Sequence, residues 1–303
     1  MSRLIADAVT AVDVGRRSRQ EDAVVADFSQ GSEMGLAVLS DGMGGHHDGD
    51  LASRILVTEM FGELFFSGAR PEAMMKDAKN TFREALDITN KRLKRHSKSG
   101  NISGDTGGTL VSIAVIGQQL RWISVGDSPL YLLRDGNLHR LNENHSMAPQ
   151  IDLMVRRGVM DAETARNHPQ RSCLTSAITG GEIARIDCPD TGLTLMPDDI
   201  VILASDGINV LSDGHIREII DRCQHKKSDC IADELMKAVR QLDVPDQDNI
   251  SLVVVKMNAA QESEHKAPEA EGEDFSTVDH GPSQKLSFLA RLFFKQNPPE
   301  VRS

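Results

Sequence analysis

Three apolar runs set the tightest limit on how this chain folds. They read TLVSIAVI at 109–116, IVILAS at 200–205 and ISLVVV at 250–255. Each run lacks the alternation of apolar and polar side chains that a half-exposed strand shows. Continuous runs of this kind are typical of strands that are covered on both faces. The sequence therefore predicts a layered fold with β-sheet at its centre.

Further strands and helices are predicted from shorter patterns along the chain. With the three runs included, β-rich stretches fall at about 7–14, 22–28, 34–40, 109–116, 119–126, 129–134, 192–196, 199–205 and 250–257. Helical spacing of apolar residues predicts helices at about 49–66, 71–96, 147–156, 213–223 and 228–241. Because strands and helices come in blocks, an α+β sandwich is favoured over alternating βαβ units.

The composition changes after about residue 258. Residues 1–258 are predicted to form one domain, and 259–282, with seven acidic side chains and one lysine, an acidic disordered linker. Residues 283–303 then form a short basic tail. Its helical wheel carries a wide apolar face, made of Leu286, Leu289, Ala290, Leu292, Phe293 and Phe294. Two interpretations stay open: a disordered end with a fortuitous apolar cluster, or docking to a partner protein or a membrane surface.

Composition excludes several classes of function. The net charge is −11 and the chain has one Trp and one Tyr, which argues against nucleic acid as a partner. The four cysteines, at positions 173, 188, 223 and 230, form no CxxC pair, so neither a zinc site nor a redox motif is indicated. No apolar run is long enough to span a bilayer, and we expect a cytoplasmic protein.

Acidic residues recur where the predicted strands begin or end. Asp41, Asp127 and Asp206 follow strands, Asp248 precedes one, and the pair Glu21–Asp22 opens another. A single Asp-Gly is most often a turn. Strand ends of a sandwich, however, converge on one rim, where grouped carboxylates repel one another unless a cation neutralises them. Oxygen ligands without Cys or clustered His suit Mg²⁺, Mn²⁺ or Ca²⁺.

At this point the chain resembles a known family, the metal-dependent Ser/Thr protein phosphatases of type 2C (PPM), and in particular its bacterial members. The resemblance covers about residues 8–257 and rests on seven segments in the family's order: GRRSRQEDA, LSDGMGGHHDGDLAS, GDTGGTLVSIAV, ISVGDSPLYLLRDGNLHRLNENHS, ARNHPQRSCLTSAI, MPDDIVILASDGINVLSD and DQDNISLVVV. It implies an α-β-β-α fold, in which helices flank a central β-sandwich of two antiparallel sheets.

The resemblance also implies a binuclear Mn²⁺ or Mg²⁺ centre. Asp41 matches the carboxylate that bridges two ions, and the carbonyl of Gly42 contributes to one of them. Asp206 and Asp248 match the remaining carboxylates. The acidic pair Glu21–Asp22 lies beside the centre, and Asp127 matches an aspartate that some members associate with a third, weaker ion.

Two further residues are implied in catalysis. Arg17 aligns with the arginine that binds the substrate phosphate, although Arg16 and Arg19 flank it. His46 takes the place of the histidine proposed as general acid, with adjacent His47 as the alternative. The residue types fit the chemistry: paired cations lower the pKa of a shared water, and a guanidinium grips two phosphate oxygens. A histidine of near-neutral pKa protonates the leaving alkoxide.

Two positions depart from the family pattern. Pro129 stands where arginine is frequent, and Asn144 precedes His145 where aspartate is usual. His145 and His168 are interpreted as structural loop residues. We expect a monomeric enzyme that acts on phosphoprotein substrates and reverses a Ser/Thr kinase. Two alternatives remain: a non-catalytic phosphoprotein-binding regulator on the same fold, and a phosphatase dedicated to one regulatory partner.

Overall fold

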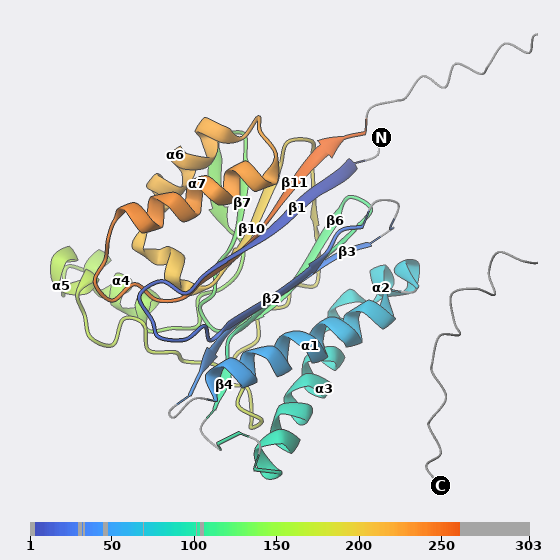
Figure 1. The fold of residues 1–303 in the computed structure, drawn as a ribbon, viewed down its shortest axis with the longest axis horizontal. Helices are drawn as coiled ribbons and strands as arrows, with labels where there is room; N and C mark the ends of the chain where they lie inside the picture. Colours follow the sequence, from blue (N-terminus) through green and yellow to red (C-terminus); the bar gives the residue numbers. More distant parts are fainter. Residues whose placement is uncertain are drawn as a thin grey trace, which may run out of the picture. The chain divides into compact units, whose positions relative to one another are not determined.

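Two antiparallel sheets lie face to face in a computed structural model of the chain (Figure 1). The structure describes residues 4–29, 32, 34–44, 48–68, 70–100, 102–103 and 106–260. These belong to one compact unit, Met1–Gln261. The predicted linker and tail, 259–282 and 283–303, lie almost wholly outside the described residues, so the predicted domain boundaries stay predictions.

The first sheet is built around the C-terminal strand. Its order is β1 (Leu4–Asp13), β11 (Ile250–Ala259), β10 (Ile200–Ala204), β7 (Leu130–Arg134) and β8 (Asn137–Arg140). The second sheet has the order β2 (Asp22–Asp27), β3 (Met34–Met43), β5 (Leu110–Ile116), β6 (Gln119–Val125) and β9 (Leu193–Thr194), and β4 (Gly107–Gly108) pairs with β3. All of these pairings are antiparallel.

The apolar runs are buried on both faces, as their sequence predicts. Between the sheets, Val111 and Ile113 of β5 belong to the same core cluster as Val201 of β10 and Val253 of β11. On the outer face of the second sheet, a separate cluster joins the sheet to α1 (Gly49–Ser67) and α3 (Ala78–Lys98).

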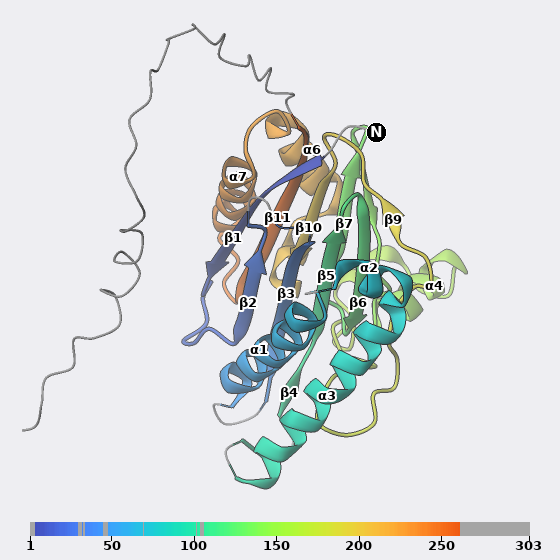
Figure 2. The ribbon, with the colours of Figure 1, turned by 90° about the vertical axis from the view of Figure 1, so that its right-hand side faces the viewer.

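Two more helices cover the first sheet. These are α6 (Asp213–Cys223) and α7 (Ser228–Gln241), and their apolar faces share a core cluster with β10 and β11. Figure 2 shows the resulting order of layers, helix, sheet, sheet, helix. The predicted α+β sandwich with flanking helices is therefore confirmed.

The structure corrects some of the predicted elements. The long helix expected at 71–96 is two helices, α2 (Pro71–Lys76) and α3, because Asp77 has a non-helical backbone (φ −135°, ψ 39°). Short elements were not predicted: β4, β8, α5 (Ala162–Arg166) and the 3₁₀ turn η1 (Asp206–Val210). The predicted helix at 147–156 is α4 (Ala148–Arg156). No helix among the described residues is long and apolar enough to cross a membrane.

The register of the strands brings several strand ends to one edge of the sandwich. Asp22, which opens β2, pairs with Asp41 near the end of β3. Leu110, which opens β5, pairs with Val125 at the end of β6. In the other sheet, Ala204 at the end of β10 pairs with Leu252 near the start of β11. Asp22 and Asp41 lie within these strand ends, and the adjoining turns carry Asp127, Asp206 and Asp248.

Candidate metal centre

Asp22 and Asp41 form a directly opposed cross-strand pair of acidic residues. Asp22 is 7% exposed, and its carboxylate accepts a hydrogen bond of 2.7 Å from the hydroxyl of Ser205. Ser205 follows β10 of the other sheet, so this bond connects the two sheets at the site. Like charges directly opposite each other destabilise a sheet, so the fold bears an electrostatic penalty here.

The backbone around Asp41 is held tightly. The Asp41 N–H donates to Thr109 Oγ1 (3.0 Å), and the Thr109 N–H donates to the Asp41 carbonyl (2.8 Å). The next residue has to be glycine. A Cβ on Gly42 would lie 2.1 Å from the Gly49 carbonyl oxygen and 2.6 Å from that of Glu21. Close approach of three chain segments thus fixes the corner of β3 that carries Asp41.

Burial and mutual repulsion perturb the titration of this acidic group. Burial raises the pKa of Asp41 well above its usual range, and the carboxylates of Asp206, Asp22, Asp127 and Asp248 raise it further. The pKa of Asp206 is raised by burial and then by Asp248. The fold therefore places carboxylates from turns that are far apart in the sequence close enough to repel one another.

Two of the carboxyl groups have raised pKa values of moderate size. Burial raises the pKa of Asp22 to about 6, while its hydrogen bond from Ser205 opposes the change. Burial raises the pKa of Asp127 to about 7, with a further contribution from Asp206 and an opposing one from Arg140. Carboxyl groups that titrate near neutral pH are a common mark of functional sites.

Arg17 is the guanidinium that points at this cluster. Its Nη2 lies 2.7 Å from Asp248 Oδ2, and the two side chains are 56% and 43% exposed. Arg16 instead forms an ion pair with Asp243, away from the aspartates of the cluster. The two arginines therefore differ in their contacts, and only Arg17 pairs with an aspartate of the cluster.

The loop that carries Arg17 is fastened by Asn249. The amide of Asn249 donates to the carbonyls of Val14 (2.9 Å) and Arg19 (2.8 Å), and its oxygen accepts from the Glu21 N–H (2.7 Å). One side chain next to Asp248 thus holds both ends of the 14–21 loop. This role was not predicted, because nothing in the sequence indicates which polar neighbour of an acidic residue contacts another loop.

The remaining predicted site residues have different outcomes. The Glu21 carboxylate lies against Gly49, where a Cβ would come within 3.1 Å of its carboxyl carbon, at the first turn of α1. His46 and its alternative His47 lie outside the described residues. Of the predicted set, Asp22, Asp41, Asp127, Asp206 and Asp248 act on one another electrostatically, and Arg17 joins them through Asp248.

The donor chemistry of the cluster fits hard divalent cations. The five aspartates offer carboxylate oxygens, and the raised pKa values of Asp41 and Asp206 show that Arg17 and Arg140 do not balance the negative charge there. Within the part of the chain that the structure describes, no three acidic, histidine or cysteine side chains already converge as a finished set of ligands. Mutual repulsion explains carboxylates that face one another without converging, and a cation would remove that repulsion.

Known proteins are similar to this chain over most of its length. A family model described as Protein phosphatase 2C matches residues 14–242. The protein phosphatase PhpP of Streptococcus pneumoniae is 30% identical over 250 residues, covering 81% of this chain and 95% of PhpP. The chain belongs to the protein phosphatase 2C family.

Solved structures give the same result for the fold. The serine/threonine phosphatase PstP/Ppp of Mycobacterium tuberculosis superposes with a TM-score of 0.68 at 26% identity, covering 84% of this chain and 99% of that one. A structure of the PstP catalytic domain in complex with two manganese ions has a TM-score of 0.65 at 24% identity, with coverage of 84% and 99%. With the family match, the chain is a metal-dependent Ser/Thr protein phosphatase.

The two departures from the family pattern have visible local roles in this phosphatase 2C. Pro129 provides a carbonyl that accepts from the Ala204 N–H (3.0 Å), and a guanidinium reaches the same turn from Arg140 on β8, whose Nη2 donates to the Asp127 carbonyl (2.8 Å). Asn144 accepts hydrogen bonds from the N–H and hydroxyl of Ser146. An uncharged amide oxygen therefore performs a turn-forming role at the position where the family usually has aspartate.

Proposed function

We propose that this phosphatase hydrolyses phosphoserine and phosphothreonine on proteins at a binuclear Mn²⁺ or Mg²⁺ centre. The observation that carries the proposal is the group of mutually repelling, buried or half-buried carboxylates, with Arg17 in contact with Asp248. Asp41, Asp206 and Asp248, with the Gly42 carbonyl, would hold the two ions, with Glu21 and Asp22 beside them. Asp127 would serve a third, weaker ion. The two manganese ions of the PstP structure support this assignment.

The chain's own residues would bind and orient the phosphate. Bound divalent cations would supply a water of lowered pKa and would neutralise phosphate charge. Arg17 is half exposed on a loop fastened by Asn249, so its guanidinium can exchange the Asp248 carboxylate for two phosphate oxygens. His46, with His47 as the alternative, would give a proton to the departing serine or threonine oxygen.

The biological setting follows the same reasoning. A phosphatase for phosphoserine and phosphothreonine opposes a Ser/Thr kinase, so we propose a cognate kinase and its phosphoprotein substrates as partners. A dedicated single partner is the narrower form of this proposal. A cytoplasmic location, a monomeric state and the docking role of residues 283–303 stay predictions from the sequence.

Metal-dependent hydrolysis by matched variants tests the proposal. The wild type should hydrolyse p-nitrophenyl phosphate and a phosphothreonine peptide with Mn²⁺, and EDTA should abolish both activities. Asp41→Asn and Asp206→Asn should each lower kcat by about 100-fold or more, because they remove charge that holds the cations. Asp87→Asn, in an exposed ion pair on α3, is the control and should match the wild type. A wild type that is inactive with every divalent cation would refute the proposal.

A further inference from the structure

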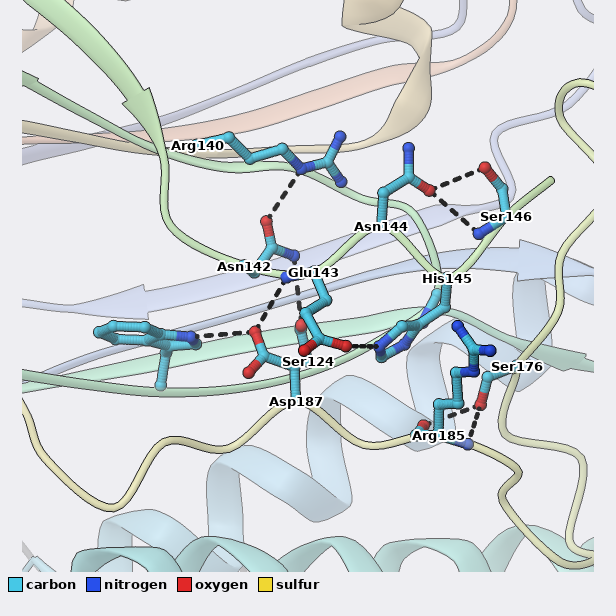
Figure 3. A network of polar contacts seen from close by, with 12 residues as sticks. Ser124, Arg140, Asn142, Glu143, Asn144, His145, Ser146, Ser176, Arg185 and Asp187 are labelled. Atoms are coloured by element: carbon cyan, nitrogen blue, oxygen red, sulfur yellow. Dashed lines mark hydrogen bonds and ion pairs between the residues drawn. The ribbon is translucent and has the colours of Figure 1, made fainter. Parts of the chain in front are cut away.

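Most of the hydrogen bonds that hold the turn carrying Asp127 come from one other segment, residues 140–145. Residues 126–129 connect β6 to β7, and residues 140–145, five of which Figure 3 labels, are hydrogen-bonded to this connection and to Leu130 at the start of β7. Leu141 N–H donates to the Leu130 carbonyl (2.8 Å), and Arg140 Nη2 donates to the Asp127 carbonyl (2.8 Å). The 140–145 segment therefore holds the backbone on both sides of Asp127, and the position of the Asp127 carboxylate depends on that backbone.

Asn142 holds the second half of this turn. Its side-chain oxygen accepts from the Leu130 N–H (2.8 Å), and its amide donates to the Ser128 carbonyl (2.9 Å). Figure 3 shows Arg140 reaching the same oxygen from its own strand, with Nε at 3.3 Å. Asn142 is buried, so each of these bonds is shielded from water.

His145 holds the first half of the turn through Gly126. The His145 N–H donates to the Gly126 carbonyl (2.9 Å), and the Gly126 N–H donates to His145 Nδ1 (3.2 Å). Gly126 has φ +104°, and a Cβ there would lie 2.6 Å from Thr109 Cγ2. The residue before Asp127 is therefore in a conformation that only glycine adopts easily. Two hydrogen bonds with His145, one through its backbone N–H and one through its imidazole, hold Gly126 there.

The geometry fixes the tautomer of this histidine. Since Nδ1 accepts a hydrogen bond, the ring is neutral and its proton is on Nε2. Nε2 lies 3.5 Å from Glu143 Oε2 and has no hydrogen-bond partner among the described residues. The side chain is buried, and burial lowers its pKa against the opposing influence of Glu143. The ring therefore acts on the Asp127 turn through one acceptor atom, Nδ1, while Nε2 faces Glu143.

We propose that His145 is a positioning residue for Asp127, acting through the acceptor Nδ1 on the Gly126 N–H. The inference rests on the proposed function, in which Asp127 serves the weaker cation. Loss of the acceptor would leave a buried N–H unsatisfied next to a strained glycine, and the turn would relax. Relaxation would move the Asp127 carboxylate and weaken the cation site it serves, without touching Arg17 or the substrate phosphate.

Two substitutions separate this role from simple loss of packing. In His145→Asn the amide oxygen stands the same three bonds from Cα as Nδ1, so the acceptor is retained. In His145→Gln the amide stands one bond farther out, where Nε2 was, so the acceptor for Gly126 is lost. We expect His145→Gln to raise the Mn²⁺ concentration for half-maximal activity by about 10-fold, and His145→Asn by less than about 3-fold. The KM for a phosphothreonine peptide should change in neither variant.

His168 provides a matched control. Its Nδ1 also accepts from a backbone N–H, that of Gln170 (3.2 Å), but in a loop outside the Asp127 turn. His168→Gln should leave the Mn²⁺ dependence unchanged. Equal Mn²⁺ shifts in the Asn and Gln variants of His145, no shift in either, or a similar shift in His168→Gln would each overturn the proposal.

Hydrogen exchange tests the same bond without any substitution. In the wild-type protein the Gly126 amide should exchange at least about 100-fold more slowly than an exposed loop amide, because it is bonded and buried. Exchange at the rate of an exposed loop would overturn the proposal even if the variants failed to fold. A wild type without divalent-dependent hydrolysis would refute the proposed function instead, while the Gly126 exchange rate would still report on the hydrogen bond to His145.

Discussion

Asp22 and Asp41 show at the residue scale how the site opposes the stability of the fold. Each is buried next to other carboxylates, and each has a raised pKa because its charged form is unfavourable there. The backbone around them is nevertheless well hydrogen-bonded, because Thr109 accepts from the Asp41 N–H and Asn249 accepts from the Glu21 N–H. The penalty is thus confined to side-chain charge, which is the property that a bound cation changes.

This penalty predicts an unusual pH dependence of stability. An aspartate titrates near 3.8 when unfolded, whereas Asp22 and Asp127 titrate near 6 and 7 in the fold. Between these values the folded protein keeps protons that the unfolded chain releases, so the free energy of unfolding falls as pH rises. In EDTA we expect a fall of at least about 2 kcal/mol between pH 5 and pH 7, measured by urea denaturation.

Two comparisons test the cause of this fall. Asp22→Asn should reduce the slope, while Asp87→Asn, an exposed residue, should keep it. Saturating Mn²⁺ should flatten or reverse the slope, because the ions bind the deprotonated carboxylates of the folded state. Stability that rises with pH in EDTA over this window would contradict the assignment of Asp22 and Asp127 as buried, charge-crowded groups.

The close packing around Gly42 predicts that a methyl group added there would strongly destabilise the fold. Gly42→Ala would place Cβ 2.1 Å from the Gly49 carbonyl oxygen and 2.6 Å from that of Glu21, and both are backbone atoms that cannot rotate away. We expect a loss of at least about 2 kcal/mol in the free energy of unfolding, together with loss of activity. Gly62→Ala in α1, where no atom lies within 4 Å of the new Cβ, should instead stabilise by about 0.5–1 kcal/mol. Thermal denaturation of both variants decides the matter.

At the element scale, the sequence predicted strands and long helices well. Strands such as β5 and β11 are continuous apolar runs, and helices α6 and α7 have the bounds that their apolar spacing indicates. The break at Asp77 was not predicted, because the apolar spacing on both sides of it is compatible with one helix. β4 and η1 are too short to leave a periodic signal. Their positions depend on tertiary contacts, such as the pairing of Gly107–Gly108 with β3.

Asn90 on α3 links a helix to a loop that has no regular structure. Its amide donates to the Gly181 carbonyl (2.8 Å), and its oxygen accepts from the Gly180 N–H (2.8 Å). Because the Gly180 N–H is buried and would lose its acceptor, Asn90→Ala should lower the free energy of unfolding by about 1–3 kcal/mol. Lys91→Ala, which removes only an exposed ion pair with Asp87, should change it by less than about 0.5 kcal/mol. Equal effects in urea denaturation would contradict this difference.

At the scale of the whole molecule, the site is a joint between two sheets. Asp22 and Asp41 belong to the second sheet, whereas Asp206 follows β10 and Asp248 precedes β11 of the first. The sequence indicated that these residues lie at strand ends, and the family resemblance indicated their roles. The order of the strands could not be predicted from residue patterns, because many strands pair with partners that lie far away in the sequence. The contacts of Ser205, Asn249 and His145 follow from that order and were therefore not predicted as parts of the site.

The strand order predicts where the chain can be shortened. β11 lies between β1 and β10 and pairs with both along its length, so it is a central strand of the first sheet. A chain that stops after residue 260 keeps every described strand pair and should hydrolyse p-nitrophenyl phosphate with the wild-type kcat and KM. A chain that stops after Asn249 loses β11, leaves β1 without its partner and exposes buried residues such as Val253, so it should not fold.

Circular dichroism and metal-dependent activity of the two shortened chains provide the measurement. A folded, active chain ending at Asn249 would show that the first sheet does not need its central strand. Loss of small-substrate activity in the chain ending at residue 260 would show that residues 261–303 belong to the catalytic fold. If that shorter chain keeps its activity and loses binding to a phosphoprotein partner or to anionic vesicles, the docking segment lies within residues 261–303, and a chain that stops after residue 282 then tests the basic, apolar tail alone.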